Sequence, residues 1–241
     1  DFRLHDPAAY ETWYGGPHPA PALLPEAIYG LTEWSRDVLR GSTLIANPGC
    51  YPTAALLALL PFAGAGLLEG SVVVDAKSGI SGAGRSAGAD YLFTELTEST
   101  RAYGLDGHRH LPEIEQGLAD AGAPVPVTFV PHLVPQSRGI LATCYLSLGE
   151  DLDDDALAAL LTDAYGDEPF VHVSDAPPAT KQTTGSNHAF VHGRRVRDRQ
   201  AVVVSVIDNL GKGAAGQAIQ NMNVAFGLDE SAGLRGLGLH P

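Results

Sequence analysis

Cysteine and long apolar runs are both scarce in this sequence. Only two of its 241 residues are cysteine, Cys50 and Cys144. One disulfide is arithmetically possible, but the disulfide framework of a small secreted protein is excluded. No apolar stretch approaches the roughly 20 residues that a membrane helix needs, and no signal peptide is visible. We therefore expect a reducing, cytoplasmic environment, with Cys144 in the core because a strand-like run surrounds it.

Positive charge is scarce as well. The chain has 15 Lys and Arg against 28 Asp and Glu, which gives a formal net charge of −13. This balance argues against nucleic acid or an anionic membrane surface as the main partner. An anionic ligand would need a local cluster of Arg or Lys to overcome the global field. The hydrophobic content of 44% allows a substantial core, in one large domain or two small ones.

The stretch around Cys50 is the most informative one. Residues 48–49 are Pro-Gly, a turn pair, and Pro52 suits the first turn of a helix. Strong helix formers occupy 54–60, and Pro61 is expected to end the helix. Unpaired N–H groups at a helix start stabilise a thiolate and an adjacent oxyanion. The pattern favours a nucleophilic cysteine, and the alternative is a buried, inert one.

Two further segments are candidates for binding or catalysis. Residues 77–88 are rich in Gly and Ser, with Lys77 and Arg85, and predict a loop whose N–H groups bind an anion; the alternative is a flexible connection. His108 and His110 flank an arginine just before a predicted helix. Because imidazole titrates near neutral pH, an acid/base role is preferred over a surface role. No further His or Cys nearby completes a metal site, and no metal is expected.

The acidic run at 150–155 is better explained as charge at a helix N-terminus than as a calcium site, because the EF-hand spacing is missing. Hairpin-like pairs at 125–148 and 187–208 predict an α+β fold with a mixed or antiparallel sheet and helices on one face, rather than a doubly wound fold. Strands are expected at 44–46, 71–76, 125–130, 139–148, 169–173, 187–192 and 201–208, and helices at 31–39, 54–60, 111–118, 156–161 and 214–226.

Taken together, five blocks in this chain resemble the N-acetyl-gamma-glutamyl-phosphate reductase family. They occur in the family's order and cover nearly the whole chain, at 47–53, 78–85, 108–114, 131–135 and 211–218. The resemblance implies the architecture of the semialdehyde dehydrogenases. That architecture is an NADP-binding Rossmann domain, then a catalytic and dimerisation domain, with the last helix returning to the first domain.

The family's Gly-rich dinucleotide fingerprint should precede these blocks, and the sequence begins without it. We therefore expect an N-terminally truncated chain. Residues 1–46 would be the C-terminal remnant of the Rossmann domain. Residues 47–208 would form the catalytic and dimerisation domain, and 209–241 the helix that returns to the Rossmann domain.

The resemblance also implies a reaction. NADPH would reduce N-acetyl-L-glutamyl 5-phosphate to the 5-semialdehyde and phosphate through a thioester on Cys50, in arginine biosynthesis. His110 is the first choice for the acid/base and His108 the second, and Glu113 would orient the His110 ring or stabilise the helix start. Expected cofactor contacts are Ser81, Gly82, Asn209, Gly211, Lys212 and Gly213. Expected substrate contacts are Asn47, Arg85, Arg109 and Arg138.

Three alternatives stay open at this point. The same chemistry could act on a related acyl phosphate, aspartyl or N-acetyl-aminoadipyl. The chain could be a dimerisation and substrate-binding module without turnover. A thiol hydrolase using Cys50 and His110 would need no NADP. A homodimer or homotetramer is expected in each family-based interpretation.

Overall fold

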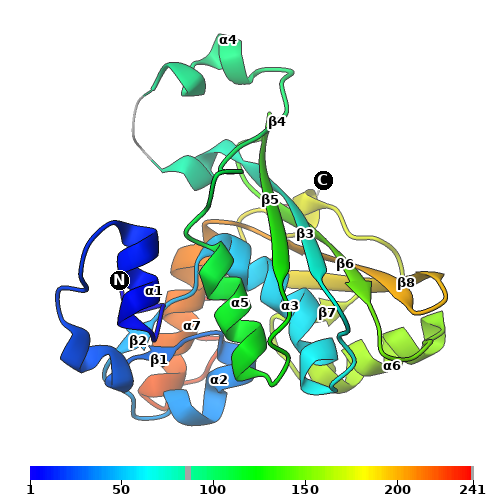
Figure 1. Ribbon diagram of the computed structural model, residues 1–241, viewed down its shortest axis with the longest axis horizontal. Coiled ribbons are helices and arrows are strands. Elements are labelled where there is room, and N and C mark those ends of the chain that lie inside the picture. Colours follow the sequence, from blue (N-terminus) through cyan, green and yellow to red (C-terminus); the bar gives the residue numbers. More distant parts are fainter. Residues whose placement is uncertain (85–87, 240–241) are drawn as a thin grey trace.

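A seven-stranded sheet forms the centre of the computed structural model, which describes residues 1–84 and 88–239 (Figure 1). Its strands are β3 Val72–Gly79, β4 Arg101–Ala102, β5 Val127–Val134, β6 Ile140–Ser147, β7 Val171–Val173, β8 Ala189–Arg197 and β9 Gln200–Ile207. They lie in the order β4, β5, β3, β6, β9, β8, β7. β3 and β5 pair in parallel, as do β7 and β8, while the other neighbours are antiparallel. The expected mixed sheet is confirmed.

One of the two expected hairpins is present, and the prediction of the other is wrong. β8 and β9 pair directly, with Ala189 opposite Ile207. β5 and β6 do not pair, because β3 lies between them and bonds to both. β3 comes from about fifty residues earlier in the chain and occupies the central position between them. There its alternate residues Val72, Val74 and Ala76 are buried in the core. The sequence pattern at 125–148 does not indicate that another strand lies between these two.

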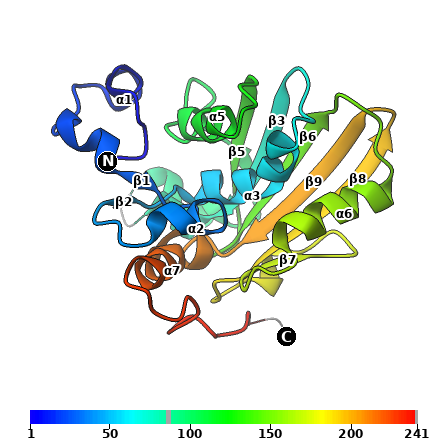
Figure 2. The same cartoon turned by 90° about the horizontal axis from the view of Figure 1, so that it is seen from below.

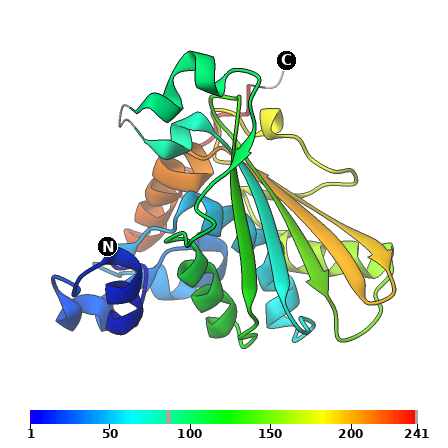
Figure 3. The same ribbon diagram turned by 45° about the horizontal axis from the view of Figure 1, so that its top comes forward.

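Three helices cover one face of the sheet (Figure 2). They are α3 Cys50–Gly64, α5 Leu111–Asp120 and α6 Asp154–Tyr165. α3 is the central one, and residues 51–63 are all buried, because the helix packs on β6 and β9 with α5 and α6 beside it. Figure 3 shows the sheet from its other face, where the strands lie in front of α6. Cys144, on β6, is fully buried in this core, as expected.

The expectation that Pro61 ends the helix is wrong, since α3 continues through Pro61 to Gly64. A proline inside a helix deprives the carbonyl four residues earlier of its N–H partner. Here that carbonyl belongs to Leu57, and it accepts a hydrogen bond from the Tyr165 hydroxyl at 2.7 Å. A side chain from α6 thus replaces the missing backbone bond and keeps the helix intact.

The N-terminal elements and the last helix lie side by side, next to the sheet (Figure 1). The elements there are α1 Pro7–Tyr14, η1 Pro21–Glu26, β1 Ile28–Tyr29, α2 Thr32–Leu39, β2 Ile45–Ala46, η5 Gly211–Ala215 and α7 Gly216–Ala225. β1 pairs in parallel with β2, and α2 packs against α7. α1 is not among the helices that the sequence predicts. Asp6 caps it by accepting a hydrogen bond from the Ala8 N–H at 2.9 Å.

The remaining short elements are η2 Ile80–Ala83, η3 Ala89–Tyr91, α4 Phe93–Leu96 and η4 Thr180–Gln182. α4 lies beyond the end of the sheet in Figure 1. At α6, Asp153 caps the helix, which confirms the interpretation of the acidic run. Within the part of the chain that the structure describes, no helix is both long and apolar enough to span a membrane.

Candidate active site

Cys50 is the first residue of α3, with Gly49 as its N-cap, and it is half-buried. The thiol is subject to two opposing influences. Burial raises its pKa to about 11, and Glu113 adds to the rise, while the N–H groups of Tyr51 and Cys50 lower it. The expected helix-start stabilisation is therefore present, but burial outweighs it. The thiol is protonated at neutral pH and needs a base to become a nucleophile.

His110 supplies an imidazole next to this turn. It is the N-cap of α5, and its ring lies so close to Gly49 that a Cβ there would come within 2.5 Å of Nε2. Only glycine fits at that position, directly before Cys50. Burial holds the pKa of His110 well below 6.5, so the ring is neutral at neutral pH. Nδ1 is buried without a hydrogen-bond partner among the described residues.

His108 fixes the backbone of His110. Its Nδ1 accepts a hydrogen bond from the His110 N–H at 3.1 Å, and the ring centroids are 4.7 Å apart, edge to face. The His108 ring also lies edge-on to Tyr51, Tyr103 and Phe129. These three aromatic residues were not expected at the site. Only Tyr51, which follows Cys50 directly, could have been found from its position in the sequence.

Glu113 is almost fully buried and holds the cysteine turn. Its Oε1 accepts hydrogen bonds from the Gly49 N–H at 2.7 Å and from the Tyr29 hydroxyl at 2.8 Å. This differs from the prediction that Glu113 orients the His110 ring: the carboxylate's hydrogen bonds go to the turn before Cys50 instead. Burial raises the pKa of Glu113, and the Arg3 guanidinium opposes that rise.

Arg3 is a site residue that sequence reasoning missed, because an isolated arginine far from the motifs carries no local signal. Its Nε donates to the carbonyl of Asn47 at 2.8 Å, and one of its terminal nitrogens lies 3.8 Å from Glu113 Oε2. The guanidinium thus bridges the N-terminal segment and the cysteine turn, and it offsets the buried charge of Glu113.

A cleft of about 480 Å³ opens beside these groups. Two cations contribute to it, Arg3 and Arg109, and the exposed Arg109 guanidinium lies 5.4 Å from the centre of the Tyr14 ring. Four residues predicted from the sequence therefore line the same cleft. They are the acid/base candidates His108 and His110, the substrate candidate Arg109 and the cofactor candidate Gly82. The lining residues of the cleft are Asp1, Arg3, Tyr14, Gly82, Gly107, His108, Arg109 and His110.

Two side chains expected to contact a cofactor are engaged inside the protein. Asn209 donates to Ser81 Oγ at 2.9 Å and accepts from the Gly139 N–H at 2.7 Å, which uses both ends of its amide. Lys212 is fully buried and forms an ion pair with Glu33 at 2.5 Å. The Lys212 ammonium lies in the interior, so its charge is not available to the expected cofactor.

Close packing accounts for the glycines on either side of Lys212. A Cβ at Gly211 would come within 2.1 Å of the Ser186 carbonyl oxygen, and one at Gly213 within 2.9 Å of Cys50 Cβ. Gly213 thus contacts the candidate nucleophile directly.

The expected substrate residues are in different places. Asn47 donates to the Ala214 carbonyl at 3.2 Å and accepts from Asn221 at 3.1 Å, so its amide holds the cysteine turn to η5 and α7. Arg138 is partly exposed and lies 3.4 Å from the buried carboxylate of Asp208. Arg85 lies outside the described residues. No group of three or more His, Cys, Asp or Glu within 1–84 and 88–239 could hold a metal ion.

The fold and the site define a class of protein. The family model "Semialdehyde dehydrogenase, dimerisation domain" matches residues 50–209. Among solved structures, aspartate semialdehyde dehydrogenase II from Vibrio cholerae is similar with a TM-score of 0.66 and 19% identity, over 83% of this chain and 68% of that one. A probable aspartate-semialdehyde dehydrogenase from Pseudomonas aeruginosa has a TM-score of 0.63 and 17% identity, over 87% and 70%. The chain has the semialdehyde dehydrogenase fold.

Curated relatives narrow this class. N-acetyl-gamma-glutamyl-phosphate reductase of Halorhodospira halophila is 56% identical over an alignment of 247 positions, gaps included. The alignment covers 100% of this chain and 71% of that protein. The protein of the same name from Symbiobacterium thermophilum is 53% identical, over 99% and 70%. The Dehalococcoides mccartyi (strain ATCC BAA-2100 / JCM 16839 / KCTC 5957 / BAV1) relative is 49% identical, over 100% and 72%. This chain belongs to the N-acetyl-gamma-glutamyl-phosphate reductase family, and the resemblance is confirmed.

Proposed function

We propose that this protein is an oxidoreductase of arginine biosynthesis that reduces N-acetyl-L-glutamyl 5-phosphate to N-acetyl-L-glutamate 5-semialdehyde and phosphate. Membership of the reductase family supports the substrate. The observation that carries the chemistry is the contact of the His110 ring with Gly49, the residue before Cys50. A protonated thiol and a neutral imidazole at one turn are the two partners that thioester formation requires.

Cys50 begins the reaction. His110 takes the thiol proton, and the sulfur attacks the carbonyl carbon of the acyl phosphate. A carbon–sulfur bond forms, the carbon–oxygen bond to phosphate breaks, and phosphate leaves with that electron pair and takes up one proton from the solvent. The N–H groups at the start of α3 lie next to Cys50, where they can stabilise the charge that develops on the carbonyl oxygen.

The second half of the reaction reduces the thioester. NADPH, when bound, supplies the hydride to the thioester carbon. The protonated His110 gives its proton to the resulting oxygen, which produces a thiohemiacetal on Cys50. His110 then takes that hydroxyl proton back, the carbon–sulfur bond breaks, and the aldehyde leaves. The departing thiolate recovers the proton from His110, so the site returns to its starting state.

Membership of a reductase family with the semialdehyde dehydrogenase fold suggests a nicotinamide cofactor, and we take it to be NADP. Gly82 lines the cleft without a side chain, which fits close approach of a planar ring. We therefore assign the cofactor contacts in this chain to Ser81 and Gly82. Asn209, Gly211 and Gly213 position neighbouring groups instead, since internal contacts explain each of them.

Arg109 and Arg3 are the proposed anion contacts. Both line the cleft, and forked guanidinium donors match carboxylate and phosphate oxygens. Two cations at one cleft provide the local positive potential that a chain of net charge −13 needs to hold an anionic substrate. Arg138 and Arg85 stay predictions, and Asn47 is proposed to act by holding the cysteine turn.

The division of the chain is part of the proposal. Residues 1–46 and 209–241 would belong with a Rossmann domain, and 47–208 would form the catalytic and dimerisation domain. The packing of α2 on α7 supports the association of the two end segments. The matched dimerisation-domain model supports an oligomer, which we propose to be a homodimer or homotetramer. We propose a cytoplasmic location, which suits two free cysteines.

The test is a substrate panel. With N-acetylglutamate semialdehyde, phosphate and NADP, the protein should form NADPH in the reverse reaction, whereas aspartate semialdehyde and N-acetyl-aminoadipate semialdehyde should react far more slowly. Cys50→Ala should abolish turnover while the circular dichroism spectrum is unchanged. Turnover by Cys50→Ala would overturn the covalent route. If the folded protein shows no turnover and calorimetry detects no NADP binding, the result would support the alternative of a dimerisation and substrate-binding module.

A further inference from the structure

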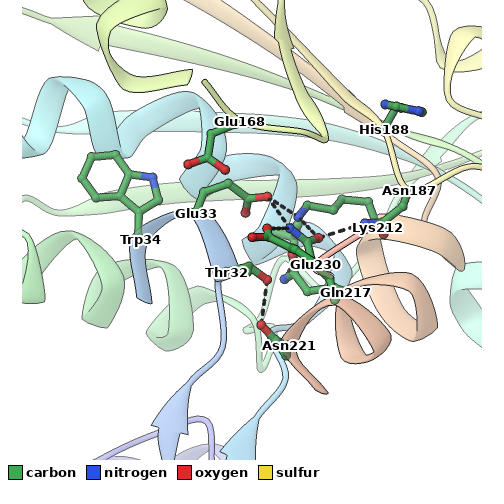
Figure 4. A network of polar contacts seen from close by, with 12 residues as sticks. Thr32, Glu33, Trp34, Glu168, Asn187, His188, Lys212, Gln217, Asn221 and Glu230 are labelled. Atoms are coloured by element: carbon green, nitrogen blue, oxygen red, sulfur yellow. Dashed lines mark hydrogen bonds and ion pairs between the residues drawn. The ribbon is translucent and has the colours of Figure 1, made fainter. Parts of the chain in front are cut away.

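A fully buried ion pair joins two segments that lie far apart in the sequence. Lys212 Nζ lies 2.5 Å from Glu33 Oε1, and neither side chain has any exposed surface (Figure 4). Gln220 completes the arrangement, because it accepts from Lys212 at 2.7 Å and donates to Glu33 at 3.1 Å. α2 and η5, the turn directly before α7, are thereby connected through one charged contact.

A buried ion pair of this kind is poor evidence for stability. Removing two charges from water costs several kcal/mol each, and the mutual attraction offsets only part of that cost. Pairs of this kind are best explained where they hold one arrangement of the chain against others. The question is therefore which arrangement Lys212 and Glu33 hold.

Lys212 belongs to η5, a π-helical turn that contacts the nucleophile. Such turns are rare and are frequently found at functional sites. Gly213, the next residue, lies so close to Cys50 that a Cβ there would meet Cys50 Cβ at 2.9 Å. The Gly213 N–H donates to the Asp208 carbonyl at 2.9 Å, which anchors the other side of the turn to the end of β9.

η5 and the first turn of α7 contact the residues on either side of Cys50 at two more points. The Ala214 carbonyl accepts from Asn47 at 3.2 Å, three residues before Cys50. Gln217 donates to Thr53 Oγ1 at 3.2 Å, three residues after Cys50. Contacts before, at and after the cysteine leave little freedom for the sulfur to move relative to η5.

α2 offers a firm support for this turn. Arg36, on α2, forms ion pairs with Glu168, three residues after α6, and with Glu230, which follows α7. Glu230 in turn accepts from Gln220 at 2.8 Å. Lys212 is thus paired with a helix, α2, that is itself bonded to Glu168 and to Glu230.

We propose that Lys212 and Glu33 are positioning residues: their buried ion pair fixes the π-helical turn Gly211–Ala215 on α2, and that turn holds the Cys50 side chain in place through Gly213. The proposal rests on the proposed role of Cys50 as nucleophile. It assigns Lys212 a function that needs no contact with substrate or cofactor.

The experiment measures alkylation of Cys50 by iodoacetamide from about pH 6 to pH 10, a range that spans ordinary thiol ionisation, in the full chain with peptide mapping by mass spectrometry. The variant is Glu33→Gln/Lys212→Met, which removes both charges at similar volume. A loosened turn admits water to the sulfur, so we expect Cys50 to react roughly tenfold faster at neutral pH, as for a fall of about one pKa unit. Turnover should fall at the same time, because the sulfur is misplaced.

Cys144 is an internal control, since it is fully buried in the core and reacts only when the fold opens. Asp151→Asn/Arg195→Gln is the matched control, because it removes an exposed ion pair of 2.7 Å between residues outside the site. Faster alkylation of Cys50 alone, and only in the first variant, supports the proposal. Unchanged alkylation of Cys50, or a parallel rise at Cys144, would overturn it. Alkylation requires neither substrate nor cofactor, so absence of reductase activity would count against the proposed function and leave this test intact.

Discussion

At the scale of the residue, burial is the main influence on both titrating groups of the site. It raises the pKa of Cys50 and lowers that of His110, so both are neutral at physiological pH. The helix start contributes in the opposite direction at Cys50 and is outweighed. Cys50 and His110 are therefore both uncharged before the substrate binds. The thiolate forms only as the proton moves to His110.

This pairing predicts a pH profile. His110 acts as a base only when deprotonated, and its pKa lies well below 6.5, so turnover should be constant near neutral pH and fall only as the pH drops through that low pKa. His110→Asn should lower kcat by roughly two to four orders of magnitude and remove the acidic limb. Steady-state rates across pH test this. An acidic limb that persists unchanged in His110→Asn would assign it to another group.

Glu113 gives a second prediction at this scale. Its carboxylate holds the Gly49 N–H directly before Cys50. Glu113→Ala removes that acceptor and should lower kcat by about 10²-fold through misplacement of the cysteine. Glu113→Gln keeps an oxygen at the same place and should retain most of the rate. Equal losses in both variants, measured by steady-state kinetics, would show that the charge, and not the hydrogen bond, is what matters.

At the scale of the element, α3 shows how a tertiary contact overrides a local rule. Pro61 is expected to end the helix, yet the Tyr165 hydroxyl takes the place of the missing N–H at the Leu57 carbonyl. The nucleophile depends on this helix, because Cys50 is its first residue. A stable α3 therefore requires a residue about one hundred positions later in the chain.

The corresponding prediction concerns stability. Tyr165→Phe leaves the Leu57 carbonyl buried without a partner, and we expect a loss of about 1–3 kcal/mol in the free energy of unfolding. Urea denaturation measures it. Tyr91→Phe, at an exposed tyrosine, serves as the control and should change little. An unchanged midpoint for Tyr165→Phe would mean that the carbonyl finds another donor.

At the scale of the whole molecule, the sheet has one face covered by α3, α5 and α6. Tyr145, on β6, is 45% exposed on the other face, near the middle of the sheet. The dimerisation-domain model matches this part of the chain. An open sheet face with an exposed aromatic side chain is a natural surface for association between copies.

We expect an oligomer in solution and a weaker one when this face is charged. Tyr145→Asp should shift the mass measured by light scattering toward the monomer, because burying an unpaired carboxylate in an interface is costly. Val196→Asp, at an exposed position in the β8–β9 hairpin, is the control. An unchanged mass for Tyr145→Asp would place the interface elsewhere.

Short-range patterns in the chain are enough to predict the local features. The Pro-Gly turn and the helix after Cys50, the His-Arg-His segment before α5, and the β8–β9 hairpin all follow from short-range patterns, because turn residues, helix formers and alternation act on neighbours in the chain. The five motif blocks determined the family in the same way.

The remaining features depend on the packing of distant segments. This packing inserts β3 between β5 and β6, pairs Lys212 with Glu33, and directs Glu113 to Gly49. It also decided the protonation of Cys50, since burial depends on every segment packed around the sulfur. Each of these contacts joins residues more than fifty positions apart, and such pairs are selected by the packing of the complete core and not by any local preference.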